Sequence, residues 1–269
     1  SERYALLGYL SSVVASYIVK QLNPTLNFQV GNIASLPFKG SDEADYKEVN
    51  SVVKRLVELA KTSWDYSEVS YSFNRSPILN GETIRQGYSE FILQVGREVD
   101  ESVALEVVNN KSFVDIYDLN GFLDTDVLRE DITHRYNPEF IYDSKKDSGE
   151  LSNRLQSDIL KEFLSYTVGC MVGRYSLDRD GLVYARSGNS GFTELVSDGA
   201  YKTFPADDDG IIPLTDQEWF PDDATNRFRE FVKVVWGEDR FQENLDFVAE
   251  SLCLHAIKPK KSESSMDTI

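Results

Sequence analysis

Residues 84–107, IRQGYSEFILQVGREVDESVALEV, decide the fold class of this chain. Apolar side chains recur in this stretch every three or four residues, at Ile84, Tyr88, Phe91, Ile92, Val95 and Val99. This spacing puts them on one face of a helix and predicts a long amphipathic α-helix. The periodicity weakens from Val103 onwards but continues as far as Gly121. So long a helical pattern indicates a mainly α-helical protein.

The same periodicity predicts further helices on both sides of this stretch. Near the N-terminus it marks one helix from Tyr4 to Ile18, which should end near Asn23-Pro24 because a proline disfavours helical geometry in the residue before it. Other helices are expected where apolar residues repeat in the same way, over residues 49–60, 155–170, 228–235 and 241–252.

Two regions favour short strands instead. Leu26 to Val30 alternates apolar and polar residues between Pro24 and Gly31. Leu182 to Ala185 and Glu194 to Val196 lie near glycine turns and are expected to form strands as well. The predicted fold class is therefore mainly α with a minor α+β character: a helical bundle-like domain with short strands near the N-terminus and around residues 182–204.

The polar run DSKKDSG at residues 143–149 is the best internal linker candidate, since it has no apolar residue and contains a glycine. A second polar break lies at residues 39–42. These breaks divide the chain into an N-terminal segment 1–40, a helical region 41–150, a C-terminal helical region 151–257 and a flexible tail 258–269. The chain starts with Ser1 rather than Met, so we expect a fragment or a processed chain.

Composition excludes several classes of protein. Hydrophobic residues make up 41% of the 269, enough for a core and against wholesale disorder. Two cysteines, Cys170 and Cys253, exclude a disulfide framework and fit a reducing compartment. The least charged stretch, Tyr4 to Val19, is shorter than the roughly 20 apolar residues of a spanning helix. We therefore expect a cytoplasmic protein without a membrane segment.

The net charge of −17 is distributed unevenly. Residues 81–150 and 203–250 each carry −9, whereas residues 1–40 carry +2 and residues 151–202 are neutral. A nucleic-acid surface needs local positive potential, so only the last two blocks could supply one. The acidic blocks are expected to be solvated faces, with binding of a basic partner as the alternative.

Motifs for self-contained chemistry are missing from the sequence. It has neither a phosphate-binding Gly-x-x-x-x-Gly-Lys-Ser/Thr loop nor a Gly-x-Gly-x-x-Gly turn after a strand. Its two histidines, His134 and His255, lie on distant segments and do not suggest a Ser-His-Asp triad or a His-rich metal site. The run Asp207 to Gly210 fails the EF-hand pattern, because the twelfth position is Asp216, and is expected to be a turn. No catalytic, cofactor or metal residue is predicted.

Several strings resemble a known family. LLGYLSS at residues 6–12 and NPTLNFQVGNI at 23–33, followed by Leu36-Pro37, are similar to the end of a target-recognition domain in bacterial DNA methyltransferases. Downstream, similar strings occur in the same order as in the C-terminal half of PglX, the adenine-specific methyltransferase family of BREX phage-defence systems. They are TSWD at 62–65, GRYSLD at 173–178, DDDGIIPLT at 207–215 and Glu218-Trp219. The resemblance spans nearly the whole chain.

The resemblance implies a parent enzyme that transfers a methyl group from S-adenosylmethionine to adenine N6 in double-stranded DNA. The family's Asn/Asp-Pro-Pro-Tyr/Phe motif and glycine-containing cofactor motif are both absent here, and Asn23-Pro24-Thr25-Leu26 does not match. The resemblance therefore implies a non-catalytic segment of a cytoplasmic bacterial enzyme, with the catalytic domain upstream. The implied role is target recognition and scaffolding, with other defence-system proteins as further partners.

The DNA-facing residues are hypothesised to come from the two blocks that are not acidic. They are Lys20, Asn27, Gln29, Arg174, Arg179 and Arg186. Against this, Asn27 and Gln29 could instead serve turn backbones, and Arg179 could pair with Asp178 or Asp180.

Two other classes of function stay open. The chain could be an acidic protein-interaction scaffold that does not touch DNA, holding basic partners on its acidic blocks. It could also be a DNA mimic whose carboxylates imitate phosphates, although a mimic should spread its charge along one surface and here the charge lies in two separate blocks. Binding to duplex DNA favours recognition, no binding favours the scaffold, and competition with DNA favours the mimic.

Overall fold

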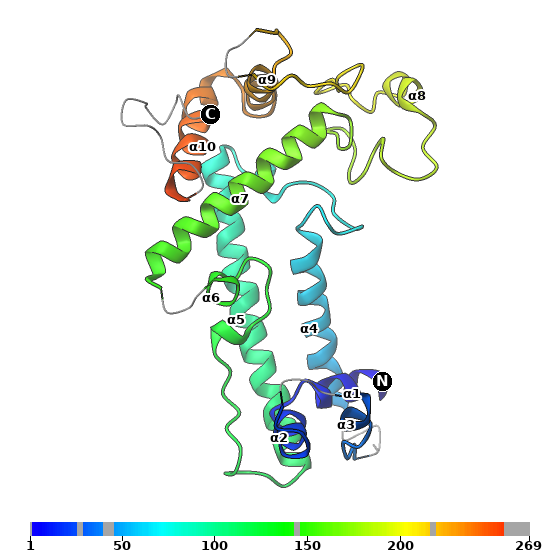
Figure 1. Ribbon diagram of the computed structural model, residues 1–269, viewed down its shortest axis with the longest axis vertical. Helices are drawn as coiled ribbons and strands as arrows, with labels where there is room; N and C mark the ends of the chain where they lie inside the picture. The colour runs from blue at the N-terminus through cyan, green and yellow to red at the C-terminus, as the bar shows by residue number, and fades with distance from the viewer. Residues whose placement is uncertain (1, 26–28, 40–45, 143–145, 216–218, 256–269) are drawn as a thin grey trace. The chain divides into compact units, whose positions relative to one another are not determined.

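The computed structural model describes residues 2–25, 29–39, 46–142, 146–215 and 219–255 (Figure 1). Over these residues it is built from helices, and the mainly α fold class is confirmed. The α-helices are α1 (Glu2–Leu10), α2 (Val13–Leu22), α3 (Val30–Ala34), α4 (Lys47–Asp65), α5 (Ile84–Ile116), α6 (Pro138–Ile141), α7 (Ser148–Met171), α8 (Phe192–Ser197), α9 (Ala224–Trp236) and α10 (Phe241–His255). Three short 3-10 helices are η1 (Pro77–Asn80), η2 (Arg129–Asp131) and η3 (Glu238–Arg240).

The predicted short strands are not found in the part of the chain that the structure describes. Of the first, residues 26–28 lie outside the described ranges, while Gln29 is the N-cap of helix α3 and Val30 its first residue. Residues 182–185 lie in bends and turns. Their backbone hydrogen bonds to residues 173–174 are Val183 N–H to Arg174 O at 2.9 Å and Tyr184 N–H to Gly173 O at 3.2 Å, which do not make a strand ladder. Residues 194–196 lie inside α8.

The chain divides into two compact units, which are described separately. Unit 1 comprises residues 1–62 and 96–140, and unit 2 comprises residues 63–95 and 141–269. Helix α5 contributes its first part, to Val95, to unit 2 and the part from Gly96 to unit 1. The predicted boundaries at residues 40, 150 and 257 were placed at polar breaks in the sequence, whereas the two units are defined by contacts between residues. The predicted boundaries stay a prediction.

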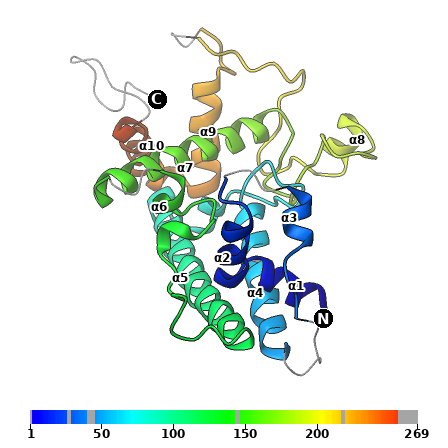
Figure 2. The same ribbon diagram turned by 60° about the horizontal axis from the view of Figure 1, so that its bottom comes forward.

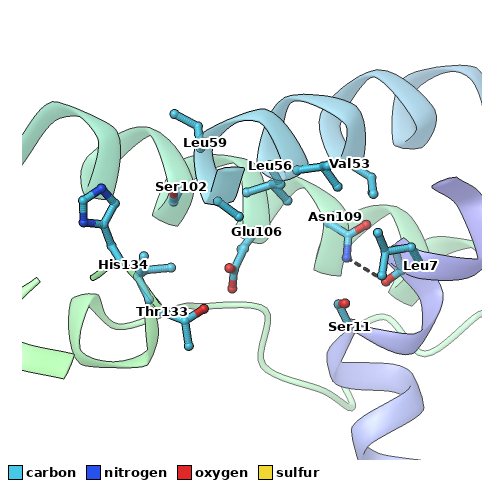
Figure 3. A pocket seen from close by; sticks show the side chains of 14 residues that line it. Leu7, Ser11, Val53, Leu56, Leu59, Ser102, Glu106, Asn109, Thr133 and His134 are labelled. Atoms are coloured by element: carbon cyan, nitrogen blue, oxygen red, sulfur yellow. Dashed lines mark hydrogen bonds between the residues drawn. The ribbon is translucent and has the colours of Figure 1, made fainter. Parts of the chain in front are cut away.

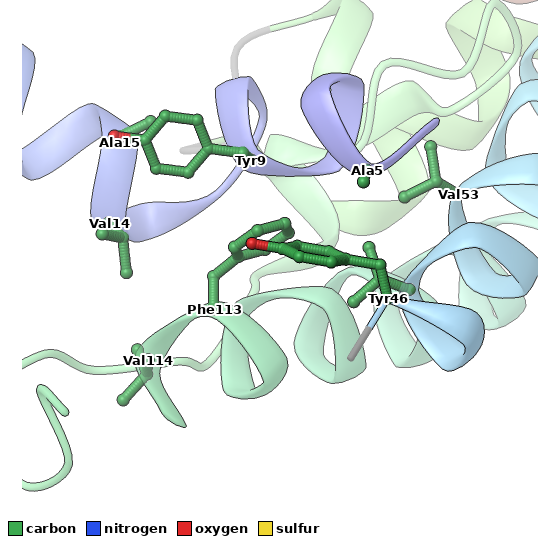
Figure 4. Close-up of a cluster of buried hydrophobic side chains, with 9 residues drawn as sticks. Ala5, Tyr9, Val14, Ala15, Tyr46, Val53, Phe113 and Val114 are labelled. Atoms are coloured by element: carbon green, nitrogen blue, oxygen red, sulfur yellow. The ribbon is translucent and has the colours of Figure 1, made fainter. Parts of the chain in front are cut away.

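The core of unit 1 is aromatic (Figure 4). Tyr9 of α1 is fully buried, with its ring stacked on Tyr117 at 5.4 Å between centroids and tilted against Phe113 at 5.7 Å. Val53 of α4 and Tyr46, just before it, belong to the same cluster. Burial of such side chains is the main stabilising contribution to a helical unit of this size.

The first predicted helix is two helices, α1 and α2, separated by Ser11 and Ser12. The prediction of one helix from Tyr4 to Ile18 was wrong because a serine at a break can replace the helical hydrogen bonds with its own side chain. Ser12 caps α2 by accepting from Ala15 N–H at 3.3 Å, and its hydroxyl donates to Tyr9 O at 2.7 Å. Helix α2 ends at Leu22, beside Asn23-Pro24 as predicted.

Helix α5 supports this break with two adjacent asparagines. Asn109 Nδ2 donates to Gly8 O at 2.9 Å, and Asn110 Oδ1 accepts from Val13 N–H at 2.9 Å. Figure 2 shows α1 lying close to α4 within unit 1. A Cβ at Gly8 would lie 2.7 Å from both Val53 Cγ2 and Asn109 Oδ1, so only glycine permits this approach.

The core of unit 2 is formed where α7 packs against α10 and α9 (Figure 1). Phe163 of α7 is buried and meets the rings of Phe228, Phe231 and Trp236 edge-on, at 6.0 to 6.4 Å between centroids. Asp147 caps α7 by accepting from Gly149 N–H at 2.9 Å, so this helix begins inside the predicted linker 143–149, of which residues 143–145 lie outside the described ranges.

No single helix in the described ranges is long and apolar enough to cross a membrane. Helices α1 and α2 are long and apolar enough for a membrane span only when they are taken together, and their axes are bent by 61° relative to each other. Val14, Ala15 and Val19 of α2 are buried inside unit 1, as expected of a core helix.

Candidate nucleic-acid interface

The three predicted arginines lie on the α7–α8 loop, residues 172–191 of unit 2. The loop starts with a sharp reversal at Gly173, whose φ of +73° is a left-handed conformation that glycine adopts without strain. Tyr201 then donates its hydroxyl hydrogen to Gly173 O at 2.7 Å, and the buried Ser176 hydroxyl donates to Ala200 O. The loop is therefore fixed at several points although it has no regular secondary structure.

A tight turn at the end of the loop is built around Asn189. The Asn189 amide nitrogen donates to Arg186 O at 2.9 Å and also to Tyr184 O, while its Oδ1 accepts from Gly191 N–H at 2.9 Å. Gly188 takes a φ of +78°. Asparagine and glycine supply this geometry because one hydrogen-bonds to nearby backbone and the other tolerates positive φ.

This turn and the preceding loop enclose a hollow of about 380 Å³. Arg179 and Arg186 both line it, together with Ser187, Gly188, Asn189 and Ser190. Two of the three predicted arginines, which lie seven positions apart in the sequence, thus line the same hollow. Figure 2 shows α8, which follows this loop, set apart from the α7, α9 and α10 core of unit 2.

Arg179 does not pair with either neighbouring aspartate. Asp180 is held by the guanidinium of Arg75, with Nε at 2.9 Å, and Asp178 accepts from Thr203 N–H at 2.8 Å and from the Thr203 hydroxyl. Arg179 itself donates to Asp198 O at 3.3 Å. Its positive charge is therefore not neutralised by an ion pair among the described residues.

The guanidinium of Arg186 has neither a hydrogen bond nor an ion pair to any described residue, and the side chain is exposed; only the backbone carbonyl of Arg186 accepts, from Asn189. A guanidinium carries five donors in a planar fork that fits the oxygens of a phosphate. An exposed guanidinium without a partner is available to bind an external anion.

Arg174 is placed differently. Its Nη1 lies 3.9 Å from Oε2 of Glu68, and half of its side chain is exposed. Burial raises the pKa of Glu68, and Arg174 opposes that rise. Arg174 does not line the hollow, so the structure brings together Arg179 and Arg186 and leaves Arg174 next to a carboxylate.

The predicted residues near the N-terminus belong to unit 1. Lys20 lies exposed in the last turn of α2, and Gln29 is the exposed N-cap of α3, where its N–H donates to Asn32 Oδ1 at 3.0 Å. Asn27 lies outside the described residues. This bond is made by the backbone of Gln29, so a DNA-facing role for its side chain stays a prediction.

Sequence reasoning missed Ser187, Asn189 and Ser190 as lining residues of the hollow. The signal was present in the sequence as two glycines, Gly188 and Gly191, that bracket an asparagine and a serine. That pattern predicts a turn but does not indicate which face of it meets an arginine.

The acidic run Asp207 to Gly210 forms a turn, as predicted. One carboxylate oxygen of Asp207 accepts from the backbone N–H groups of Asp209, Gly210 and Ile211 at 2.8 to 3.2 Å. Burial alone would raise the pKa of Asp207, but a hydrogen bond with the Asp209 side chain and these backbone bonds together lower it. In the described residues, no group of three acidic, histidine or cysteine side chains is arranged to hold a metal ion.

Comparison with known proteins shows two relatives over nearly the whole chain. The chain is 41% identical over 269 residues to the adenine-specific methyltransferase BrxX of Escherichia coli O9:H4 (strain HS). It is 29% identical over 272 residues to the adenine-specific methyltransferase PglX of Lacticaseibacillus casei (strain Zhang). The chain is homologous to these BREX-type enzymes.

The homology confirms the resemblance to PglX and limits it. The chain spans only about a fifth of each relative, 22% of BrxX and 20% of PglX. No protein-family model matches the chain. It therefore corresponds to one part of these longer relatives.

Proposed function

We propose that this chain is a non-catalytic, DNA-holding part of a site-specific DNA adenine-N6 methyltransferase. The observation that carries the proposal is the hollow in unit 2, which Arg179 and Arg186 both line without an ion pair to any described residue. Asp180 also lines it, but its carboxylate is paired with Arg75. An enzyme that modifies a base must take that base out of the stack, so other parts of the protein have to hold the duplex.

Arg179 and Arg186 would bind backbone phosphate, with the Ser187 and Ser190 hydroxyls beside them as further donors. Contacts of this kind position the duplex but do not read its sequence. Base reading would then fall to other residues, of which Lys20 and Asn27 remain predictions. The chain's role as a recognition and scaffolding part of the enzyme is likewise part of the proposal.

The cofactor S-adenosylmethionine would be held elsewhere in such an enzyme. The absence of the family's glycine-containing cofactor motif from the sequence supports this part of the proposal. Binding of S-adenosylmethionine to the chain, or methylation of DNA by the chain alone, would contradict the non-catalytic role.

The direct test is the affinity of the chain for a fluorescently labelled 20-base-pair duplex, measured by anisotropy at low salt. Binding is expected in the range typical of sequence-independent contacts, about 10⁻⁴ to 10⁻⁶ M. The double variant Arg179→Ala/Arg186→Ala should weaken it by at least about tenfold, since two phosphate contacts are lost.

Arg240→Ala is the matched control, because Arg240 is an exposed arginine of unit 2 that pairs with Glu243 and lies outside the hollow. It should leave the affinity within about twofold. Equal losses in the control and the double variant would show that only total charge matters, and the proposal for the hollow would then be abandoned.

A second candidate function, an acidic interaction surface for other proteins, is favoured by one observation. Ile211, Leu214 and Trp219 are 67%, 84% and 73% exposed, next to the acidic turn at residues 207–210. Large exposed apolar side chains often mark protein contacts. Failure of the chain to bind duplex DNA would favour this function, and displacement of DNA from a basic DNA-binding peptide would favour a DNA mimic.

A further inference from the structure

Unit 1 contains a second site, separate from the hollow of unit 2, that the proposed function does not use (Figure 3). The cavity of about 220 Å³ lies between α1, α4, α5 and the segment after η2. Leu7 of α1 and Val53, Leu56 and Leu59 of α4 provide apolar walls. Helix α5 contributes Glu106, the only acidic side chain among the lining residues.

Glu106 occupies a position that is unusual for a carboxylate. In Figure 3 its side chain extends from α5 towards the space between Thr133 and Ser11. It is partly buried and makes neither an ion pair nor a hydrogen bond with any described residue. Burial raises its pKa, and the charge of Asp131 raises it further. A carboxylate that has lost part of its hydration and has no partner is stabilised by a counter-ion.

The polar neighbours of Glu106 are already used within the protein. Ser102 donates its hydroxyl hydrogen to Glu98 O at 2.8 Å, and Asn109 donates to Gly8 O at 2.9 Å. The lining contains no lysine or arginine. The only residue of the lining that could become positive is therefore His134.

Both ring nitrogens of His134 are engaged by other groups. Its Nδ1 accepts from Tyr136 N–H at 3.2 Å, and its Nε2 lies 3.0 Å from Oε2 of Glu98. Both side chains of this pair are at most 5% exposed. The histidine contacts Glu98 rather than Glu106, so Glu106 has no cationic partner among the described residues.

We propose that this cavity binds a primary ammonium group carried on a short aliphatic chain, with the Glu106 carboxylate as its counter-ion. The apolar walls would cover the aliphatic chain, while the ammonium would donate to Glu106 and to the nearby Thr133 hydroxyl. A pocket that combines apolar walls with one convergent charged group is the usual form of a small-ligand site. Two kinds of molecule carry a primary ammonium group on an aliphatic chain: a free alkylamine and a lysine side chain.

The volume of the cavity determines which test ligands are suitable. At roughly 30 Å³ for each water-sized group, about 220 Å³ accommodates roughly seven non-hydrogen atoms. n-Hexylamine has that size, and n-hexanol has the same size without the charge. A ligand of this size typically reaches a Kd on the order of 1 mM. Acetyl-Gly-Lys-Gly-amide presents the same ammonium group on a peptide.

The experiment titrates the complete chain with each of the three compounds and follows binding by NMR. n-Hexylamine should bind at least about tenfold more tightly than n-hexanol. Glu106→Gln should reduce n-hexylamine binding to the level of n-hexanol binding to the unaltered chain. Glu130→Gln is the matched control, because it removes an exposed carboxylate of unit 1 that does not line the cavity. It should leave n-hexylamine binding unchanged.

A second variant tests the place of binding without changing the charge. Ala60 is an exposed residue of α4 that lines the cavity, so Ala60→Trp should obstruct the site and abolish n-hexylamine binding while the chain stays folded. Peptide binding in addition to n-hexylamine binding identifies a lysine side chain as the natural group, and n-hexylamine binding alone identifies a free amine. Equal binding of n-hexanol and n-hexylamine, or binding unaffected by both Glu106→Gln and Ala60→Trp, would overturn the proposal.

Discussion

Gly8 shows how much of the architecture of unit 1 depends on one residue. Its backbone lies where α1 approaches α4 and α5, and a Cβ there would be 2.7 Å from Val53 Cγ2 and from Asn109 Oδ1. Asn109 is buried and donates to Gly8 O, so it has no room to move away. The sequence shows a glycine inside a helical pattern, which by itself indicates only a local cost in helix stability.

Gly8→Val should therefore destabilise the chain by about 1–3 kcal/mol, because overpacking forces neighbouring side chains and backbone to shift. Urea denaturation followed by circular dichroism measures the change. Gly96→Ala is the control, since a Cβ at Gly96 in α5 meets nothing within 4 Å. It should stabilise the chain by up to about 1 kcal/mol. Equal effects of both substitutions would contradict the close approach at Gly8.

Asp158 gives unit 2 a defined acid sensitivity. Burial alone would raise the pKa of Asp158, but hydrogen bonds from Lys161 at 2.7 Å and from the Tyr142 hydroxyl at 2.5 Å outweigh it, and the pKa is lowered. A carboxyl whose pKa is lower in the folded than in the unfolded state stabilises the fold above its unfolded value, near ~3.9. That contribution is lost as the pH falls through the folded pKa.

Asp158→Asn should accordingly lower the free energy of unfolding by about 1 kcal/mol at pH 7, a figure reduced from that of a fully buried charged pair because the site is largely solvated. The difference between variant and unaltered chain should shrink as the pH approaches 3. Thermal unfolding at pH 7, 5 and 3 measures it. A difference that stays constant over this range would mean that the ionised form of Asp158 contributes nothing.

At the scale of elements, the periodicity of apolar residues predicted the helices well and predicted their breaks poorly. Helices α4, α5, α7, α9 and α10 all lie where the spacing indicates them. The break at Ser11-Ser12 was missed because the apolar spacing continues across it, while the interruption is held by Asn110 of α5, almost a hundred residues away. Such a cap comes from the tertiary structure and leaves no local signal.

The break gives a prediction of its own. Ser12→Ala should cost about 1 kcal/mol in the free energy of unfolding, because the N-cap of α2 is lost together with the hydroxyl bond to Tyr9 O. Ser11→Ala serves as the control, since Ser11 is exposed and its side chain caps no helix. Urea denaturation separates the two, and an unchanged midpoint for Ser12→Ala would indicate that α2 does not depend on this cap.

The strands were predicted wrongly for a related reason. Short alternating runs near glycines are typical of strands. Residues 182–185, however, do not form a ladder of hydrogen bonds with a neighbouring segment, and residues 194–196 belong to helix α8, which starts at Phe192. The DNA-facing role of the predicted residues stays a prediction. The family resemblance and the charge distribution pointed to Arg179 and Arg186, but the hollow that both line depends on the turn at Asn189 and could not be inferred from either.

At the scale of the whole molecule, the central feature is a strongly acidic chain in which two arginines without an ion pair to described residues line the same hollow. The net charge is −17, yet Arg179 and Arg186 share a hollow and form no ion pair with described residues. A general surface charge of this sign repels DNA, so any binding must be concentrated at such a site. This makes the salt dependence of binding informative about the number of contacts as well as their strength.

The most direct test of the account is therefore the slope of log K against log salt concentration for duplex DNA. We expect the unaltered chain to bind with a clear negative slope, and Arg179→Ala/Arg186→Ala to reduce that slope by about two, since each phosphate contact contributes about 0.9. Adding Arg174→Ala should change it little, because Arg174 already lies beside Glu68. No binding by the unaltered chain, or the same slope for all variants, would contradict the claim that this part of the enzyme holds DNA at the hollow.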